Sequence, residues 1–469
     1  MMQNRKLQRL LQDLAHADAS KRRNAAEALA DADERAVYPL LRALRDENHG
    51  VQDAAMRSLI AIGGETVAYM VLPLLREDSY LRNTAMIMLR DIGPVTVPFL
   101  YPLLNDKDDD VRKFSIDLMI DIQFDVDAQK IVPMLKDPNA NVRASAAKAL
   151  GLLGYKEAVP QLVDILSDEE WVSFSALEAL GALRDESSVA PVIELLARDS
   201  VTLRYAAIET LGKIGSPAAR HALEQHMVKA DDMERSAALK SLLQIGITPT
   251  VPGTVDLLIS MFSDGDWDER FIALKGLAEL KDPKAAKTVI DIGGSLEPSD
   301  PEAEDRLYMI RSSLREFATC EALVAVLTDP SIRFRGRVIA IELIGELKCD
   351  RAIAHLIKCI EVDVRDVRRA SIKALADIND YESTSALIDA VDDYDSHVRK
   401  AAVSALGKIA DPKAFEPVLM MVQVEKYQDV LDEAVQALVR IDREAVRSRL
   451  DEFDERIRGL AEHYLQVEL

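Results

Sequence analysis

Few residues in this sequence have the types and the spacing that catalysis or metal binding requires. The seven histidines are scattered, and the closest pair, His221 and His226, is five residues apart. On a helix these two rings lie on different faces and cannot share a metal ion in the i, i+4 manner. No glycine-rich phosphate loop or serine-centred elbow is present, and Gly293 with Gly294 indicates only a turn. We therefore predict no catalytic residues, no metal site and no cofactor.

The three cysteines are Cys320, Cys349 and Cys359. Their number is odd and too small to cross-link a chain of 469 residues, which indicates a reducing compartment. Cys349 and Cys359 are flanked by apolar positions, so we predict buried, unreactive thiols that pack as small hydrophobic residues. A reactive thiol would need an exposed, electropositive setting.

Acidic residues dominate the charge, with 80 Asp and Glu against 58 Lys and Arg and a net charge of −22. The runs 106–110 and 389–395 fall between expected helices, where acids favour the next helix N-terminus, so we interpret them as solvated caps. This charge opposes binding to a phosphate backbone, and we predict no nucleic-acid partner. No uncharged apolar stretch reaches about 18 residues, and residues 1–14 lack the apolar run of a signal peptide. We expect a cytoplasmic protein that binds no membrane.

The elements that would position any site come from an internal repeat. The segments 141–154, 203–215 and 398–410 align residue by residue around a ValArg, LeuArg or ValArg pair. With the arginine of each segment as position zero, equivalent positions recur at 22, 52, 82, 112, 143, 173, 204, 235, 270, 306, 337, 368, 399 and 431. Eleven of the thirteen spacings lie between 30 and 32 residues, so the chain consists of about fourteen repeats.

The columns of this alignment describe a helical hairpin. Position three is alanine and position seven is leucine in eleven of fourteen repeats, a spacing that marks one buried helix face. Glycine at position eight, as in Gly407, allows a close helix neighbour, and glycine at position eleven, as in Gly215, can adopt φ > 0 and end the helix. A second amphipathic run follows, with an early proline such as Pro160. Hairpins of this size must stack to bury their apolar faces.

The pattern Asp-x-x-x-ValArg-x-x-AlaAla-x-AlaLeuGly-x-Ile/Leu-Gly resembles HEAT-like repeats of the phycobilisome-lyase type. The resemblance covers almost the whole chain and implies an all-α fold, a right-handed α-solenoid of about fourteen stacked two-helix repeats. It does not specify an activity, since such repeats occur in scaffolds, bilin-attaching lyases and DNA glycosylases.

Two longer spacings, 235 to 270 and 270 to 306, interrupt the repeat and contain proline, glycine and acidic clusters. We expect about nine N-terminal repeats in 1–292, an acidic Pro/Gly loop at 293–305, and about five C-terminal repeats in 306–469 ending in a cap helix. The loop at 293–305 is either a bend in the solenoid or a tolerated insertion.

Position zero is arginine in eleven of the fourteen repeats. A guanidinium repeated at one helix position is suited to bonding carboxylates or carbonyl oxygens of adjacent repeats, so we predict an internal ladder rather than a set of phosphate ligands. The arginines assigned to this ladder are Arg82, Arg112, Arg143, Arg204, Arg235, Arg270, Arg337, Arg368 and Arg399.

Positions one, five and nine form the exposed stripe of the same helix, which the resemblance places on the concave side. The charge at positions five and nine is negative in the first four repeats and positive in repeats eight to ten, and position one becomes aromatic or apolar in the middle of the chain. Aromatic anchors beside cations are typical of protein-recognition surfaces, although the rings could instead pack between helices. The residues assigned to this surface are Trp171, Phe174, Tyr205, Lys240, Trp267, Phe271, Lys275, Arg311 and Arg315.

These observations favour a non-enzymatic, monomeric scaffold that binds a protein partner along its concave face. The resemblance leaves two alternatives, a bilin lyase or chromophore-loading factor and a DNA glycosylase, and the acidic net charge disfavours the second.

Overall fold

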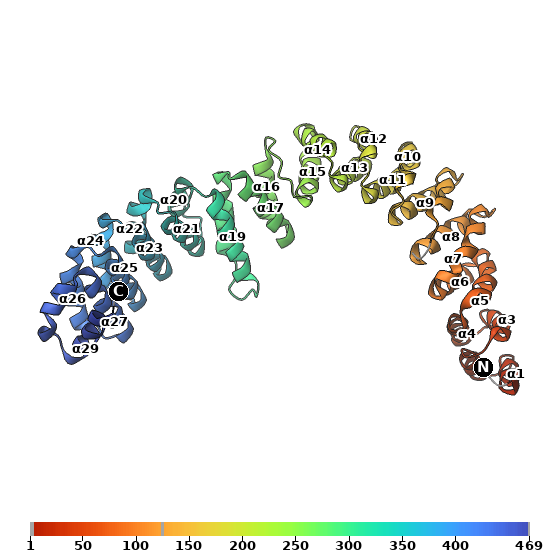
Figure 1. Cartoon of the computed structure of the whole chain (residues 1–469), viewed down its shortest axis with the longest axis horizontal. Helices are drawn as coiled ribbons and strands as arrows, with labels where there is room; N and C mark the ends of the chain where they lie inside the picture. Colours follow the sequence, from red (N-terminus) through yellow and green to blue (C-terminus); the bar gives the residue numbers. More distant parts are fainter. Residues whose placement is uncertain (1–3, 123–125, 468–469) are drawn as a thin grey trace. The chain divides into compact units, whose positions relative to one another are not determined.

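The computed structural model describes residues 4–122 and 126–467, and they fold into helices joined by short turns (Figure 1). These residues form 29 α-helices and 15 short 3₁₀ segments and contain no β-strand. Two compact units make up the chain, an N-terminal unit, Met1–Ile247, and a C-terminal unit, Thr248–Leu469. Each unit is a stack of helical hairpins, so the predicted all-α solenoid of HEAT-like repeats is confirmed.

Each unit has two layers of helices, and we call the layer that carries repeat positions zero to eleven the first layer (Figure 1). In the N-terminal unit the first layer comprises α2 (Ala19–Ala28), α4 (His49–Ile62), α6 (Ser79–Ile92), α8 (Asp109–Ile122), α9 (Ala140–Leu152), α11 (Glu170–Leu183), α13 (Val201–Ile214) and α15 (Asp232–Gln244). The second layer comprises α1 (Asn4–Asp13), α3 (Val37–Ala43), α5 (Gly64–Val71), α7 (Val97–Leu100), α10 (Val159–Asp164), α12 (Val189–Leu195) and α14 (Pro217–Lys229).

The C-terminal unit repeats this arrangement. Its first layer comprises α17 (Trp267–Leu280), α19 (Ala303–Phe317), α21 (Phe334–Glu346), α23 (Arg365–Ile378), α25 (Ser396–Ile409), α27 (Gln428–Ile441) and α29 (Glu455–Gln466). The second layer comprises α16 (Thr254–Asp264), α18 (Ala286–Ser295), α20 (Cys320–Thr328), α22 (Ile353–Val362), α24 (Thr384–Asp389), α26 (Phe415–Val424) and α28 (Arg443–Ser448). Helix α29 lies beyond the last repeat counted in the sequence and packs on α27.

Helix α25 shows how the repeat sequence forms a first-layer helix. Asp395 caps its N-terminus by accepting a hydrogen bond from the backbone N–H of His397, as expected for the acidic run 389–395. Positions three and seven, Ala402 and Leu406, are fully buried. The helix ends at Ala410 in the left-handed conformation, with φ of +53°. The N-terminal cap, the buried apolar face and the C-terminal stop of α25 are therefore all specified within one repeat of the sequence.

Glycines fill the two roles that their positions predict. Gly215 at position eleven has φ of +66° and ends α13. At position eight of α25, a Cβ on Gly407 would lie 2.8 Å from Cα of Ala437 in α27, which is closer than a side chain tolerates. Both predictions are confirmed. The same left-handed stop also occurs at non-glycine residues, which the sequence pattern did not indicate: Arg184, Lys281, Lys348, Asn379 and Ala410.

The stacking is irregular around the loop predicted at 293–305, inside the C-terminal unit. The prediction of a turn at Gly293 and Gly294 was wrong, because both lie in α18 and the loop is shorter than predicted, with α19 beginning at Ala303. Besides α23, helix α21 packs on α18 more than on α19, and a Cβ on Gly294 would clash with the backbone nitrogen of Gly336. The two compact units, by contrast, divide between Ile247 and Thr248, in the other long spacing. The division of repeats at 293–305 stays a prediction.

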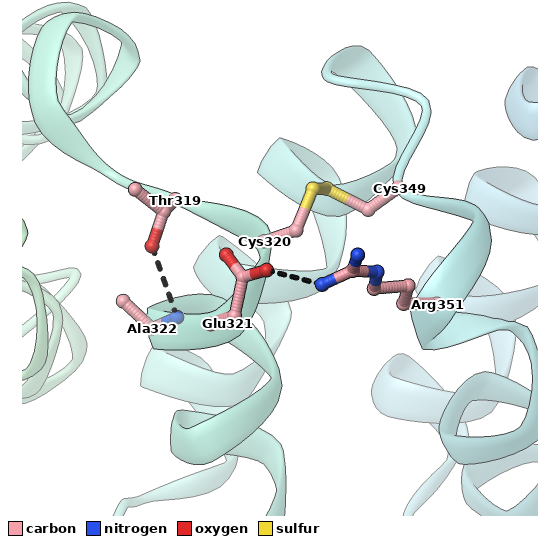
Figure 2. The surroundings of a disulfide bond; sticks show 6 residues. All are labelled: Thr319, Cys320, Glu321, Ala322, Cys349 and Arg351. Carbon is pink, nitrogen blue, oxygen red and sulfur yellow. Dashed lines mark hydrogen bonds and ion pairs between the residues drawn. A yellow bond between two sulfur atoms is a disulfide. The ribbon is translucent and has the colours of Figure 1, made fainter.

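The cysteine prediction was wrong for Cys349. Cys320 and Cys349 form a disulfide with a Cα–Cα distance of 5.7 Å, which joins the start of α20 to the turn after α21 (Figure 2). A salt bridge from Arg351 to Glu321 spans the same junction at 2.7 Å. Sequence spacing drew attention to Cys349 and Cys359, whereas hairpin stacking brings Cys320, 29 residues away, next to Cys349. Cys359 is a free, buried thiol whose pKa is raised by burial.

No single helix in 4–122 or 126–467 is long and apolar enough to cross a membrane. One bent pair, Ser79–Ile92 with Pro94–Asn105, reaches the required length and composition only when both halves are counted together, across a bend of 113°.

Candidate partner-binding site

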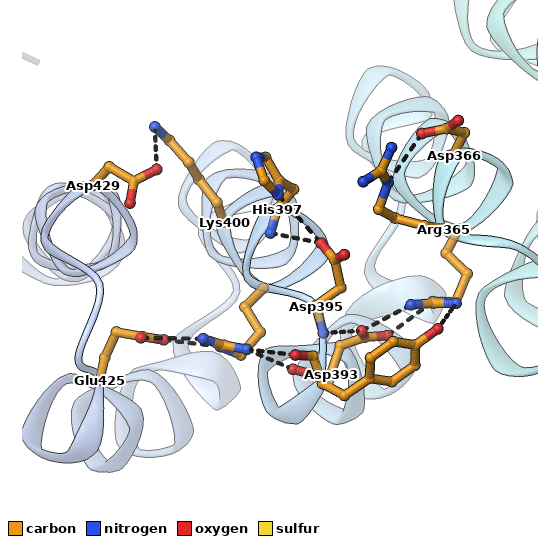
Figure 3. A network of polar contacts seen from close by, with 11 residues as sticks. Arg365, Asp366, Asp393, Asp395, His397, Lys400, Glu425 and Asp429 are labelled. Carbon is orange, nitrogen blue, oxygen red and sulfur yellow. Dashed lines mark hydrogen bonds and ion pairs between the residues drawn. The ribbon is translucent and has the colours of Figure 1, made fainter.

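The position-zero arginines of neighbouring repeats are linked through shared acidic residues. In the C-terminal unit, both carboxylate oxygens of Asp393 accept hydrogen bonds of 2.9 Å from Arg368, and its backbone carbonyl accepts one of 2.8 Å from Arg399 (Figure 3). Arg399 in turn donates to both carboxylate oxygens of Glu425, at 2.8 and 3.1 Å. Asp393 therefore binds the arginine of the preceding repeat through its side chain and the arginine of its own repeat through its backbone carbonyl.

The same geometry occurs in the N-terminal unit. Arg112 binds the Asp137 carboxylate at 2.7 and 2.8 Å, and Arg143 binds the Asp137 carbonyl oxygen at 2.8 Å and the Asp168 carboxylate at 2.6 and 2.7 Å. Ser173 replaces arginine at position zero of the next repeat, and its hydroxyl lies 3.0 Å from the carbonyl oxygen of Leu166 and 3.2 Å from that of Asp168. The arginine linkage is therefore interrupted at this repeat.

The remaining ladder arginines fall into two groups. Arg204 binds Glu234 at 2.6 Å, Arg337 binds Asp363, and Arg82 reaches Asp110 at 3.4 Å, so these three bond to the following repeat. Arg235 and Arg270 instead donate to carbonyl oxygens of their own hairpins, Met227 at 2.9 Å and Ser263 at 3.0 Å. The ladder geometry thus changes at the long spacings of the repeat.

Arginines lower the pKa values of three acids of the N-terminal ladder, Asp46, Asp137 and Asp168. At Asp168 the hydrogen bond from Arg143 lowers the pKa and outweighs the opposite effect of burial. Asp46 is affected in the same way by Arg22. At Asp137 burial acts to raise the pKa, but hydrogen bonds from Arg112 and from the backbone N–H of Asn139 together bring it below its usual range. These carboxylates therefore stay ionised inside the stack.

In the N-terminal unit, the predicted surface residues lie on consecutive first-layer helices. Trp171 and Phe174 on α11 are exposed, Trp171 by 52%. Tyr205 on α13 is half-buried, and its pKa is raised by burial and then by the charges of Asp231 and Glu234. Lys240 lies on α15 and is half-buried.

In the C-terminal unit, the predicted residues differ in how far they are free to bind a partner. Phe271 on α17 is 49% exposed, and Lys275, one turn along, is exposed and makes no ion pair with the described residues. Trp267 instead contacts two guanidinium groups, with the Arg306 carbon 4.5 Å and the Arg270 carbon 5.1 Å from its ring centroid. Its ring therefore packs at the junction between repeats, the alternative weighed for these aromatics.

Arg311 and Arg315 link α19 to α21. Arg311 binds Glu342 at 2.7 Å, and Arg315 binds Glu346 at 2.7 Å. Both pairs are at least one-third exposed, so they contribute little to stability and can exchange with other carboxylates in water. An acidic partner would compete with Glu342 and Glu346 for these arginines.

A cavity of about 930 Å³ lies in the C-terminal unit against α19, α21, α23 and α25. Part of its lining comes from positions one, five and nine of four consecutive repeats, including Leu307, Val338, Arg369, Lys373, Ser404 and Lys408. Other lining residues, such as Leu296 and Pro298, come from the loop before α19. The stripe that the repeat pattern leaves exposed therefore lines a groove in this unit. Among the described residues, no group of three or more His, Cys, Asp or Glu side chains is arranged to hold a metal ion.

Sequence reasoning missed Arg369 and Lys373, which lie in this groove. One sequence feature could have indicated this site. A single repeat has cations at both position one and position five, Arg369 and Lys373, and both this repeat and the next have alanine at position two. The charge sum used positions five and nine, where Lys373 is balanced by Asp377, so the pair was not singled out.

HEAT-repeat models match residues 7–90, 96–179, 128–202, 170–243 and 353–439. The chain belongs to the HEAT-repeat family. These matches cover repeats in both units of the HEAT solenoid.

Among curated proteins, two phycocyanobilin lyase alpha subunits are similar to this HEAT protein. The subunit from Picosynechococcus sp. is 25% identical over 174 residues, and the subunit from Nostoc sp. is 24% identical over 205 residues. The matches cover 34% and 41% of this chain and span 63% and 71% of the relatives' lengths.

Among solved structures, a chain from a structure of Kap95p with RanGDP is 14% identical with a TM-score of 0.46, covering 95% of this chain and 73% of that chain. Importin beta in an ammonium sulfate condition is 14% identical with a TM-score of 0.42, covering 98% of this chain and 73% of that chain. At these TM-scores nothing about the partner of this HEAT protein follows.

Proposed function

We propose that this HEAT protein is a non-enzymatic scaffold that binds a segment of a partner protein along its first-layer helices. The observation that supports the proposal is that different repeat positions of those helices make the contacts between repeats and line the open surface. Position zero is engaged in the ladder, whereas positions one, five and nine line an open cavity of about 930 Å³ in the C-terminal unit. Stacked repeats that expose the same helix face provide an extended binding surface.

Exposed aromatic residues on the same face support the proposal. Trp171 and Phe174 in the N-terminal unit and Phe271 in the C-terminal unit are large apolar side chains that the fold leaves in water. Aromatic side chains such as Phe271 are enriched at the buried cores of protein interfaces. A neighbouring charge such as Lys275 favours a partner of the opposite charge.

We test the proposal by affinity capture with the full chain as bait. A Phe271→Ala, Lys275→Glu variant is expected to lose the captured partner, because it removes an aromatic anchor and reverses a charge one helix turn away. Helicity and melting temperature are expected to stay unchanged, because both side chains are exposed.

A matched control carries the same two kinds of change on the second layer, Tyr381→Ala with Lys358→Glu, both at exposed positions. This control is expected to retain the partner. Equal capture by wild type and the Phe271 variant would exclude the α17 patch, and equal loss in the control would show that overall charge, not this face, governs capture.

A second candidate is a chromophore-loading role, and the similarity to the two phycocyanobilin lyase alpha subunits favours it. In that case a linear tetrapyrrole mixed with the protein would shift its visible absorption. An unchanged spectrum would argue against this role.

A further inference from the structure

The groove in the C-terminal unit has the length of an extended peptide segment. Its lining runs from Leu307 on α19 to Lys408 on α25, across four consecutive first-layer helices. Packed helices lie about 8–10 Å apart, so three steps between helices span roughly 25–30 Å. About eight residues of extended chain cover that distance. A compact small molecule would contact only part of such a groove.

Small apolar side chains form the floor of the groove. Ala370 on α23 and Ala401 on α25 line it at position two of consecutive repeats, and Val338 lines it from α21. All three are partly exposed, whereas the equivalent apolar residues at positions three and seven are buried in the stack. Alanine at two adjacent repeats leaves room for a side chain of a ligand over the floor.

Two cations in the groove have no ion-pair partner among the described residues, Arg369 and Lys373 on α23. They are four residues apart and therefore neighbours on one helix face, where like charges repel. Two carboxylates on or beside α23 are engaged elsewhere, with Asp377 binding Lys408 at 2.6 Å and Asp366 binding Arg365 at 3.3 Å. Glu304 also lines the groove, from α19, and is exposed.

Glu346 also lies near this pair, but its carboxylate binds Arg315 at 2.7 Å. Its pKa is lowered first by that hydrogen bond, with burial opposing it and a smaller contribution from the charge of Lys373. Two of the other groove cations, Arg311 and Lys408, are paired with Glu342 and Asp377. Arg369 and Lys373 are therefore the groove cations that an anionic ligand can bind without displacing a carboxylate of the chain.

We propose that this groove binds an extended acidic segment of a partner protein, with carboxylates on Arg369 and Lys373 and an apolar side chain over Ala370 and Ala401. The proposal rests on the scaffold function proposed above and specifies the binding site and the chemistry of the ligand. Charge complementarity supplies orientation, and the apolar floor supplies contact area.

The test is selection of random peptides of about twelve residues on the full chain, followed by synthesis of enriched sequences with a fluorescein label. Enriched peptides are expected to combine Asp or Glu with an apolar residue. Their affinity, measured by fluorescence anisotropy, is expected to fall at least about ten-fold in an Arg369→Glu, Lys373→Glu variant.

Two further variants separate the site from general charge effects. Lys358→Glu with Lys413→Glu makes the same charge change at exposed positions outside the groove and is expected to change the affinity less than about two-fold. Ala401→Trp fills the floor without changing charge and is expected to weaken binding, with far-ultraviolet circular dichroism confirming that the helices are intact.

The proposal is overturned if no acidic peptide is enriched, if the groove variant binds as tightly as wild type, or if the control variant loses as much affinity. It is also overturned if only a linear tetrapyrrole binds and its spectral shift depends on Arg369 and Lys373. If the peptide test fails in one of these ways but partner capture still depends on Phe271 and Lys275, the scaffold function stands and only the groove proposal is overturned. If partner capture does not depend on Phe271 and Lys275 either, both proposals are overturned.

Discussion

At the scale of single residues, position-zero arginines bind acids of the following repeat and so connect neighbouring hairpins. The recurrence of arginine at position zero predicts a ladder because eleven identical cations on one helix position need identical partners. Their acidic partners could not be selected from sequence, since loops such as 105–109 and 389–395 each contain several acids. The structure selects the acid 24 to 26 residues downstream in six cases, from Arg22 with Asp46 to Arg399 with Glu425.

A buried ladder pair and an exposed pair are expected to differ in their effect on stability. Arg368 is 5% exposed, and Arg368→Met would leave the Asp393 carboxylate without its main partner in a poorly hydrated site. We expect a loss of about 3–5 kcal/mol in the free energy of unfolding. For the exposed Arg315–Glu346 pair, Arg315→Met is expected to cost less than about 1 kcal/mol. Urea unfolding measures the loss in the free energy of unfolding for each variant. A loss for Arg368→Met no larger than that for Arg315→Met would show that the buried ladder pair stabilises the fold no more than an exposed pair does.

At the scale of elements, the repeat pattern predicts the helices and their ends well, because cap, stripe and stop are local. It does not predict junctions between hairpins. Cys320 and Cys349 are an example, since their pairing depends on how α20 stacks beside the turn after α21. The packing of α21 on α18 is another, because it requires two glycines, Gly294 and Gly336, that lie 42 positions apart and match no repeat column.

The disulfide is expected to stabilise the C-terminal unit and to leave one thiol free. Closing a loop with a sequence separation of 29 residues contributes about 3–4 kcal/mol by restricting the unfolded chain. Reduction is therefore expected to lower the unfolding midpoint of wild type but not of a Cys320→Ser, Cys349→Ser variant. Thiol titration under denaturing conditions is expected to give one thiol before reduction and three after it.

The same cysteines test the proposed location. In a reducing cytoplasm Cys320 and Cys349 would be present as thiols, so alkylation of cells lysed directly into denaturant would label both. Labelling of Cys359 alone after denaturation would indicate an oxidising compartment and would contradict the cytoplasmic expectation.

At the scale of the whole molecule, fold class and family follow from repetition, because a period of about 31 residues leaves few architectures. The groove could be predicted only in outline. The stripe at positions one, five and nine is a property of the repeat, but the cavity depends on the irregular packing around α19 and on the pairing of each charge. The sequence gives no basis for distinguishing Arg311 from Arg369. Only the structure shows that Arg311 is paired with Glu342.

The ladder predicts how stability depends on pH. The pKa values of Asp46, Asp137, Asp168 and Glu425 are lower in the folded protein than in the unfolded chain. Their contribution is therefore complete above the unfolded values near about pH 4 and is lost as the pH falls through the folded values. Thermal unfolding followed by circular dichroism is expected to show a steep loss of stability below about pH 4.

A variant lacking one ladder arginine is the control for this dependence. In Arg143→Met the pKa of Asp168 returns toward its ordinary value, so stability is expected to change less between neutral and acidic pH than in wild type. An identical pH dependence in both proteins would show that the acid sensitivity arises outside the ladder.

The separation of position zero from positions one, five and nine has a consequence for how such a chain can change over time. Position zero supplies most of the arginine contacts between adjacent hairpins, whereas the proposed ligand contacts on Arg369 and Lys373 lie at positions one and five of the same kind of helix. Substitutions at positions one, five and nine can therefore change which ligand is bound while the arginine ladder at position zero stays the same. Two descendants of this protein could share nearly all their ladder residues and still recognise unrelated targets.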